Sequence, residues 1–200
     1  MLNKSYSKGI IFSSIAAIFW GLPQPLFFNE LNHVNTIEVV AHRGFWSFIF
    51  LFLLLILISN ISDLVEIFQS RKKISILTIT ALLIATNWSG FIYSVGQERV
   101  QDASMGYFIT PMISIVLGYF FLNEKITKPK FISVCLMILG ILFLFISLNQ
   151  FPFLIIWIGT SWALYGLLRK TINVNPSVGL LYETFVISLI SIPYLVYLFL

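Results

Sequence analysis

The chain has 200 residues, 58% of them hydrophobic and 10% charged, and a formal net charge of +4. Soluble domains average about 25% charged residues, so this chain has too few polar side chains to cover a water-soluble globule. Because its apolar residues also fall in long blocks, the composition predicts an integral membrane protein. Cys135 is the single cysteine, which excludes an intrachain disulfide.

The first apolar block, Gly9–Phe28, is too long for a signal peptide and lacks a small-residue cleavage pattern. We therefore expect it to remain in the protein as a membrane helix. Near its outer end, Pro23 and Pro25 remove backbone hydrogen-bond donors. This predicts either a simple kink or a hinge beside a substrate path.

Six further apolar blocks have roughly the twenty residues that a spanning helix needs. They are Ile37–Ser59, Ile74–Gly96, Asp102–Leu122, Pro129–Leu148, Phe151–Leu168 and Gly179–Leu200. Short polar breaks separate them, so no soluble domain fits, and the lack of period-two alternation excludes a closed β-barrel. The sequence predicts an all-α integral membrane protein, a polytopic bundle of about seven transmembrane helices.

The basic residues predict how this bundle is oriented, because cytoplasmic loops carry an excess of lysine and arginine. If the N-terminus is cytoplasmic, ten of the twelve basic residues lie on the cytoplasmic side. Arg99 alone lies on the opposite side, and Arg43 lies within a span. We therefore expect a multi-pass protein with a cytoplasmic N-terminus.

Two weak internal similarities predict a repeat. The stretch FWGLPQPLFF resembles SWALYGLLRK, which aligns Trp20 with Trp162 at an offset of 142 residues, and TIEVVAHRGFWSFI resembles SVGLLYETFVISLI at an offset of 141. A five-helix unit crosses the membrane an odd number of times, so its second copy is inverted, as in many secondary transporters. Residues 1–149 would form the first unit and residues 150–200 would begin the second. The chain would then be part of a 5+5 design of about ten helices.

The fourth block carries small or polar residues spaced 3, 4, 3 and 4 along the sequence: Ser104, Tyr107, Pro111, Ser114 and Gly118. We expect the helix face that they share to point to the protein interior. The third block repeats the pattern with Thr80, Asn87, Gly90 and Ser94. Two interpretations stay open, helix packing and the lining of a cavity. We favour cavity lining for the larger amphipathic side chains, Trp20, Asn87, Tyr107 and Trp162.

Arg43 lies about 9 Å below the outer end of its span, at 1.5 Å per residue, with His42 beside it. Either its side chain snorkels to the interface as an anchor, or the protein uses the charge within the membrane. Glu183 has a matching depth measured from the cytoplasmic side, which separates it from Arg43 by about 15 Å. We expect no salt bridge between the two, but two polar groups that flank one central cavity from opposite sides.

Other functional classes find little support. The sequence contains no metal-ligand cluster, no glycine-rich phosphate loop and no paired carboxylates on one span. It therefore predicts neither an enzyme nor a metal or cofactor site, and nothing in it predicts binding to nucleic acid. A receptor is disfavoured by the cytoplasmic N-terminus, and a retinal protein by the lack of a lysine in the last span.

Several stretches resemble the EamA family of the drug/metabolite transporter superfamily, and most closely its RarD branch. They are WGLPQPLFF (20–28), EVVAHRGFWS (38–47), WALYGLLRK (162–170), GLLYET (179–184) and, most specific, the stretch from NWSG to LNEK (87–125). The resemblance implies ten helices in two inverted units with both termini cytoplasmic, in a bacterial inner membrane. The chain departs from this pattern by ending after the seventh block. The branch is named for a link to chloramphenicol sensitivity, which leaves the physiological substrate open.

We therefore expect a secondary transporter that works without ATP and moves small organic metabolites or drugs by alternating access. Its cavity would lie between the first, third, fourth and sixth spans, with the second and seventh spans gating. The alternative is a truncated, non-transporting membrane protein or an assembly partner. The expected substrate contacts are Trp20, Arg43, Asn87, Trp88, Tyr93, Tyr107, Trp162 and Tyr165, with His42, Pro111 and Glu183 in gating or coupling. Membrane lipid and an unidentified small molecule are the expected partners. Proton coupling through His42 and a homo-oligomer stay open.

Overall fold

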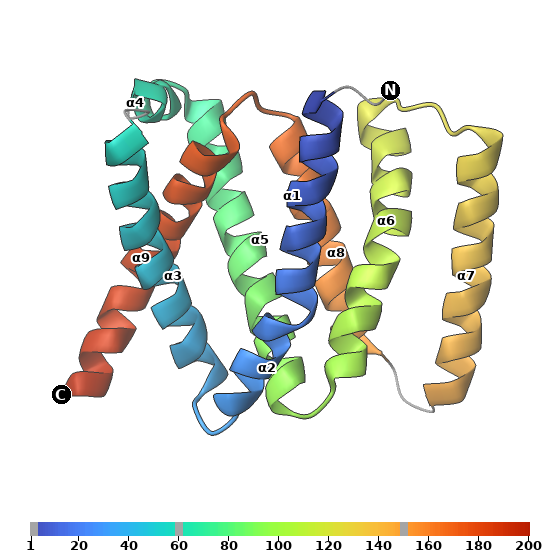
Figure 1. The fold of residues 1–200 in the computed structure, drawn as a ribbon, viewed down its shortest axis with the longest axis horizontal. Coiled ribbons are helices and arrows are strands. Elements are labelled where there is room, and N and C mark those ends of the chain that lie inside the picture. Colours follow the sequence, from blue (N-terminus) through green and yellow to red (C-terminus); the bar gives the residue numbers. More distant parts are fainter. Residues whose placement is uncertain (1–3, 59–61, 149–151) are drawn as a thin grey trace.

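The computed structural model describes residues 4–58, 62–148 and 152–200, and every regular element in these ranges is an α-helix. The helices are α1 (Lys4–Gly21), α2 (Pro23–Glu30), α3 (Thr36–Ile58), α4 (Ser62–Phe68), α5 (Arg71–Gly96), α6 (Val100–Leu122), α7 (Lys128–Leu148), α8 (Phe153–Lys170) and α9 (Pro176–Phe199). The long helices lie side by side and alternate in direction across one common thickness (Figure 1). The predicted all-α architecture is confirmed.

Five segments of the described ranges are long and apolar enough to cross a membrane: Lys8–Glu30, Thr36–Leu57, Arg71–Gly96, Val100–Leu122 and Pro176–Leu198. The protein is therefore a polytopic membrane helix bundle. The predicted spans Pro129–Leu148 and Phe151–Leu168 are not among these five. The helices that occupy them, α7 and α8, nevertheless run across the same thickness as their neighbours (Figure 1).

The core of the bundle forms where α8 packs against α5 and α6, and where α9 packs against α3 and α5. A close contact joins Gly106 of α6 to Gly159 of α8. A Cβ atom added to Gly159 would lie 2.8 Å from the carbonyl oxygen of Gly106. Helix backbones approach this closely only where side chains are absent, so the two glycines fix how near α6 lies to α8.

The first predicted span is interrupted near its outer end. α1 ends at Gly21 and α2 begins at Pro23. Pro23 occupies the first turn of α2, where a missing N–H group costs no helical hydrogen bond. The N–H of Leu22 still donates to the carbonyl of Ile18 over 3.0 Å. The predicted interruption therefore lies at the junction of α1 and α2, within one apolar stretch that is long enough to cross the membrane.

The short helix α4 was not predicted, because its sequence was interpreted as a polar break. Ile67 of α4 is fully buried and packs in one cluster with Leu55 of α3 and Leu77 of α5. One apolar side chain per turn is enough to hold such a short helix against its neighbours. Just after it, Ser70 caps α5 by accepting a hydrogen bond from the backbone N–H of Lys73.

The prediction for the face of α6 is largely wrong. Ser104, Pro111 and Ser114 are exposed, and Ala103 and Gly106 are buried instead. The helix turns Gly106 toward α8 because a close backbone approach needs a residue without a side chain. The corresponding prediction for α5 is confirmed, since all four residues of its polar face are buried: Thr80, Asn87, Gly90 and Ser94.

The segment between α6 and α7 is tied to the end of α8 by an ion pair. Lys170 donates from Nζ to Oε1 of Glu124 over 2.8 Å. This hydrogen bond and the charge of Lys170 hold the pKa of Glu124 below its ordinary value. Both side chains are largely exposed, so the pair positions the segment more than it stabilises the fold.

Candidate substrate site

Rings from four helices meet in the interior, in what we call the aromatic cluster: Trp20 (α1), Phe91 (α5), Tyr107 (α6), and Trp162 and Tyr165 (α8). The Trp20 centroid lies 5.6 Å from Tyr107 and 5.5 Å from Trp162. Trp162 stacks on Tyr165 with centroids 5.1 Å apart. These distances are typical of attractive ring pairs. The helices are those of the first, third, fourth and sixth predicted spans.

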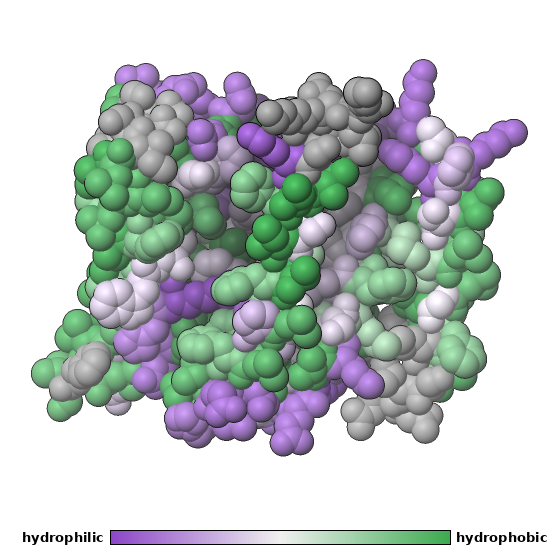
Figure 2. Space-filling model, in the orientation of Figure 1, coloured by the Kyte–Doolittle hydropathy of each residue, from purple (hydrophilic) through white to green (hydrophobic). Residues whose placement is uncertain are grey.

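The aromatic cluster is not sealed into the core. Trp20 remains 40% exposed, and Tyr107, Trp162 and Tyr165 are half-buried. α1 lies in front of α5, α6 and α8, and the surface is hollowed beside it (Figures 1 and 2). The rings of the cluster are therefore partly exposed beside α1.

Asn87 holds the aromatic cluster in place from α5. Its Nδ2 donates to the Ile158 carbonyl over 2.9 Å and to Oγ of Ser161 over 3.0 Å. Its Oδ1 accepts from the Tyr107 hydroxyl over 2.9 Å. Asn87 is completely buried, so its amide joins α5, α6 and α8, and in this conformation it positions Tyr107 and does not face a cavity.

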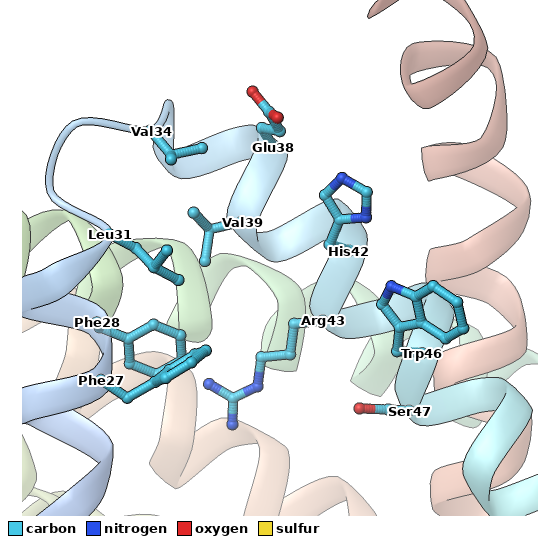
Figure 3. A pocket seen from close by; sticks show the side chains of 10 residues that line it. All are labelled: Phe27, Phe28, Leu31, Val34, Glu38, Val39, His42, Arg43, Trp46 and Ser47. Atoms are coloured by element: carbon cyan, nitrogen blue, oxygen red, sulfur yellow. The ribbon is translucent and has the colours of Figure 1, made fainter. Parts of the chain in front are cut away.

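Arg43 of α3 points into the bundle. Its guanidinium carbon lies 4.1 Å from the ring centroid of Trp88 and 5.5 Å from that of Phe28, both within the range of cation–π attraction. Its Nη1 atom is buried and has no hydrogen-bond partner among the described residues. The guanidinium is directed toward Phe27 and Phe28 and away from the outer turns of α3 (Figure 3). In this conformation Arg43 does not snorkel to the interface.

A cavity of about 460 Å³ opens beside Arg43, and we call it the Arg43 cavity. α2 and α3 supply its walls, which are mostly apolar or aromatic, with Phe28, Leu31, Val39 and Trp46 among them. Phe28 connects it to the aromatic cluster, because its ring centroid lies 6.1 Å from that of Phe91. Cavities of this size and composition are typical of small-molecule sites.

Glu183 of α9 lies at the other side of the aromatic cluster and is fully buried. Its Oε1 accepts from the Thr80 hydroxyl over 2.7 Å, and its Oε2 accepts from the Tyr165 hydroxyl over 3.2 Å. Arg169 provides the positive charge, with Nε 3.8 Å from Oε1. The ion partner of Glu183 is thus Arg169 and not Arg43, and Tyr165 links this carboxylate to the cluster.

Three of the residues predicted for the site lie apart from the aromatic cluster. Tyr93 is 44% exposed and lines a groove with the α2–α3 connection. Pro111 is exposed on α6, where its missing N–H group leaves the Tyr107 carbonyl without a helical donor. His42 lines the Arg43 cavity, but its ring is directed away from the guanidinium (Figure 3).

Four residues of this region were not predicted for the site, namely Phe28, Phe91, Thr80 and Arg169. The two phenylalanines are hard to single out in a chain that contains 20 of them. Thr80 belonged to the predicted polar face of α5, for which packing and cavity lining both stayed open. Arg169 was counted with the cytoplasmic basic residues, although an arginine one turn beyond Tyr165 on one helix face was a usable signal. In the described ranges no group of three or more histidine, cysteine or acidic residues could hold a metal ion.

Comparison with known proteins identifies the family of this chain. The profile of the EamA-like transporter family matches residues 7–146. The chain belongs to the EamA-like transporter family. This is a family of transporters and not of enzymes, and the predicted resemblance to it is confirmed.

The relatives of this EamA-like chain include proteins named RarD. It is 35% identical over 191 residues to an uncharacterized transporter of Vibrio cholerae, covering 96% of this chain and 63% of the relative. It is also 35% identical over 181 residues to Protein RarD of Escherichia coli, covering 90% and 61% of the two chains. A chloramphenicol-sensitive protein RarD of Pseudomonas aeruginosa is 24% identical over 180 residues, covering 88% and 60%.

The EamA-like chain thus spans less than two thirds of the length of these relatives, 63% and 61% of the first two. No solved structure matches it.

Proposed function

We propose that this EamA-like chain functions as a secondary transporter, which works without ATP and moves small organic metabolites or drugs by alternating access. The observation that carries the proposal is the aromatic cluster. It joins rings from four helices, leaves Trp20 40% exposed and is connected through Phe91 and Phe28 to the cavity of about 460 Å³ beside Arg43. Aromatic rings that several helices bring together near a cavity are typical of small-molecule sites.

The proposed roles follow from these contacts. Trp20, Tyr107 and Trp162 would contact the apolar part of a substrate, and Asn87 would hold Tyr107 in place for it. Arg43 would supply a charge from α3, on one side of the cluster. On the other side, Glu183 and its hydrogen bond from Tyr165 would couple movement of α9 to the cluster.

The proposed gate is the helix pair α3 and α9, which pack against each other along the bundle. Each carries one ionisable group of the proposed site, Arg43 on α3 and Glu183 on α9. A tilt of one helix against the other would open one side of the cluster as it closes the opposite side. We also propose that His42, which lines the Arg43 cavity, takes part in proton coupling.

We also propose that the protein lies in the bacterial inner membrane with its N-terminus in the cytoplasm, surrounded by lipid and with self-association left open. The relatives with which it is compared are bacterial. The ends of α6 and α8 and the starts of α1, α5, α7 and α9 lie at one end of the bundle (Figure 1). That end collects the basic residues, which favours a cytoplasmic position for it.

An uptake screen in membrane vesicles tests the proposed function. Vesicles that contain the chain are compared with empty vesicles for accumulation of a panel of organic acids, amines, neutral metabolites and aromatic antibiotics. Trp162→Ala should reduce the uptake of whichever compound accumulates, because it removes the ring at the centre of the cluster. Trp157→Ala is the matched control, since Trp157 lies on the same helix and stacks on Phe153 outside the cluster.

The outcome of this screen also distinguishes a transporter from the alternative, a non-transporting membrane protein or an assembly partner. Accumulation above empty vesicles that falls with Trp162→Ala and not with Trp157→Ala supports a transporter. If no compound accumulates above empty vesicles, the chain is better described as a non-transporting membrane protein or an assembly partner. If a compound accumulates and both variants behave like the wild type, the aromatic cluster is not the substrate site.

A further inference from the structure

We propose that the Arg43 cavity binds an organic monoanion. Its carboxylate would pair with the guanidinium of Arg43, and its apolar or aromatic body would lie against Phe28 and the aromatic cluster beyond it. The inference rests on the proposed function and deepens it, because it names the chemical class of the substrate.

The first argument is the charge of Arg43. The guanidinium keeps its proton at any physiological pH and carries five N–H donors. Its Nη1 is buried without a hydrogen-bond partner, and in the described ranges Arg43 forms no ion pair. A buried charge is costly unless it is paired and hydrogen-bonded. The contacts with Trp88 and Phe28 offset only part of that cost, so an acceptor with a negative charge completes the site.

The second argument is the arrangement of the nearby acidic groups. Glu38 lines the same cavity, but its carboxylate is directed away from the guanidinium (Figure 3). It lies five residues earlier on α3, or about 7.5 Å along the helix axis. Glu183 already accepts from Thr80 and Tyr165 and pairs with Arg169. Neither carboxylate neutralises Arg43.

The third argument is the orientation of the guanidinium. Its N–H donors lie in the plane of the group, and its central carbon lies over the Trp88 ring, 4.1 Å from the ring centroid. The contact with the ring face holds the guanidinium without using its N–H donors, and the buried Nη1 has no hydrogen-bond partner among the described residues. A carboxylate meets the edge of a guanidinium through two parallel hydrogen bonds. The site is therefore prepared for a planar acceptor with two oxygen atoms.

The other residues that line the Arg43 cavity favour a ligand with a single negative charge and an apolar or aromatic body. Arg43 is the one cationic side chain that is permanently charged among the residues lining the cavity, and most of the other lining residues are apolar or aromatic. A phosphate dianion would leave one negative charge uncompensated in these surroundings, which is costly. A carboxylate balances the arginine one to one. An aromatic body gains ring contacts with Phe28, and through Phe91 with the cluster.

The test is a binding measurement on the purified full chain in detergent. Phenylacetate is titrated and the change in tryptophan fluorescence is recorded, since Trp88 lies against the guanidinium. Phenylacetamide has the same shape without the charge, and phenethylamine reverses the charge. We expect saturable binding of phenylacetate and at least about tenfold weaker binding of both other probes, as the loss of a charged hydrogen-bond partner implies.

Two variants and one control locate the binding. Arg43→Gln should weaken phenylacetate binding at least about tenfold and leave phenylacetamide binding unchanged. Arg43→Lys should give an intermediate affinity, because lysine keeps the charge and loses the planar fork. Arg71→Gln is the matched control, since it removes one positive charge from an exposed position at the start of α5, and it should bind like the wild type. The comparison of probes on the wild type needs no variant to fold.

The inference is overturned if the wild type shows no preference for the carboxylate, including no binding of either probe up to about 10 mM, or if Arg43→Gln binds phenylacetate as the wild type does. Its failure is distinct from that of the proposed function. Uptake of a neutral or cationic compound in vesicles without carboxylate binding would contradict the anion site alone. Carboxylate binding without any uptake would contradict the transporter alone.

Discussion

Asn87 is the residue at which three helices are joined by hydrogen bonds. We expect Asn87→Ala to destabilise the protein by about 2 kcal/mol, because it leaves the Tyr107 hydroxyl without its acceptor and removes the buried hydrogen bonds from Asn87 to the Ile158 carbonyl and the Ser161 hydroxyl. The measurement is the apparent melting temperature in detergent. Ser89→Ala is the control, since the Ser89 hydroxyl bonds only to the Ala85 carbonyl of its own helix. Equal melting temperatures for the two variants would show that the junction is not needed.

Glu183 belongs to a buried ion pair, whereas Glu124 belongs to a more exposed one. We expect Glu183→Gln to cost about 3 kcal/mol, because it leaves Arg169 charged and unpaired where its side chain is only 14% exposed. Glu124→Gln removes the partner of a lysine that is 64% exposed, and it should change the melting temperature little. A larger loss for Glu124→Gln than for Glu183→Gln would contradict this assignment.

At the scale of single residues, the sequence singled out four members of the aromatic cluster, Trp20, Tyr107, Trp162 and Tyr165, and two of the charged residues near it. Arg43 and Glu183 stand out because a charge inside an apolar run needs a reason. Their different depths also predicted that they do not pair, and Glu183 indeed pairs with Arg169. The sequence could not predict that Phe28 and Phe91 extend the ring contacts, because a phenylalanine in a membrane helix is as ordinary on the lipid side as in the interior.

Among the helices, the contact of α6 with α8 carries the most specific prediction. Gly159→Ala should destabilise the protein by about 1–3 kcal/mol, because the new methyl group would meet the backbone carbonyl of Gly106, which cannot move as a side chain can. Gly166→Ala lies on the same helix with no atom within 4 Å of the added Cβ. It should be neutral or slightly stabilising, since alanine favours a helix.

Thermal unfolding of both glycine variants in detergent checks this prediction. If Gly159→Ala melts at or above the temperature of Gly166→Ala, the close contact of α6 and α8 is not present in the protein.

The helices also show where sequence patterns mislead. The polar face of α5 was predicted to be interior and is buried, because Thr80, Asn87 and Ser94 all hydrogen-bond within the bundle. The similar pattern on α6 was predicted to be interior and is mostly exposed. The difference is that α6 packs through Gly106, and the spacing of polar residues carries no information about which small residue lies at the closest approach.

For the whole molecule, the first prediction concerns its orientation. Asn32→Cys in the α2–α3 connection and Lys72→Cys in the first turn of α5 are each made in a Cys135→Ser background, and both positions are exposed. The α2–α3 connection and the start of α5 lie at opposite ends of the bundle (Figure 1). An impermeant thiol reagent added outside intact cells should label position 32 and not position 72, because the basic end stays in the cytoplasm. Labelling of position 72 alone would reverse the proposed topology.

The account depends most on the claim that the aromatic cluster opens alternately to the two sides of the membrane. A cysteine at its centre, Tyr107→Cys in the Cys135→Ser background, tests this without knowledge of the substrate. Right-side-out and inside-out vesicles are treated with an impermeant thiol reagent, and the one-sided positions 32 and 72 serve as controls. We predict that position 107 reacts in both kinds of vesicle while each control reacts in one. Reaction of position 107 from one side only, or from neither, would contradict alternating access through the cluster.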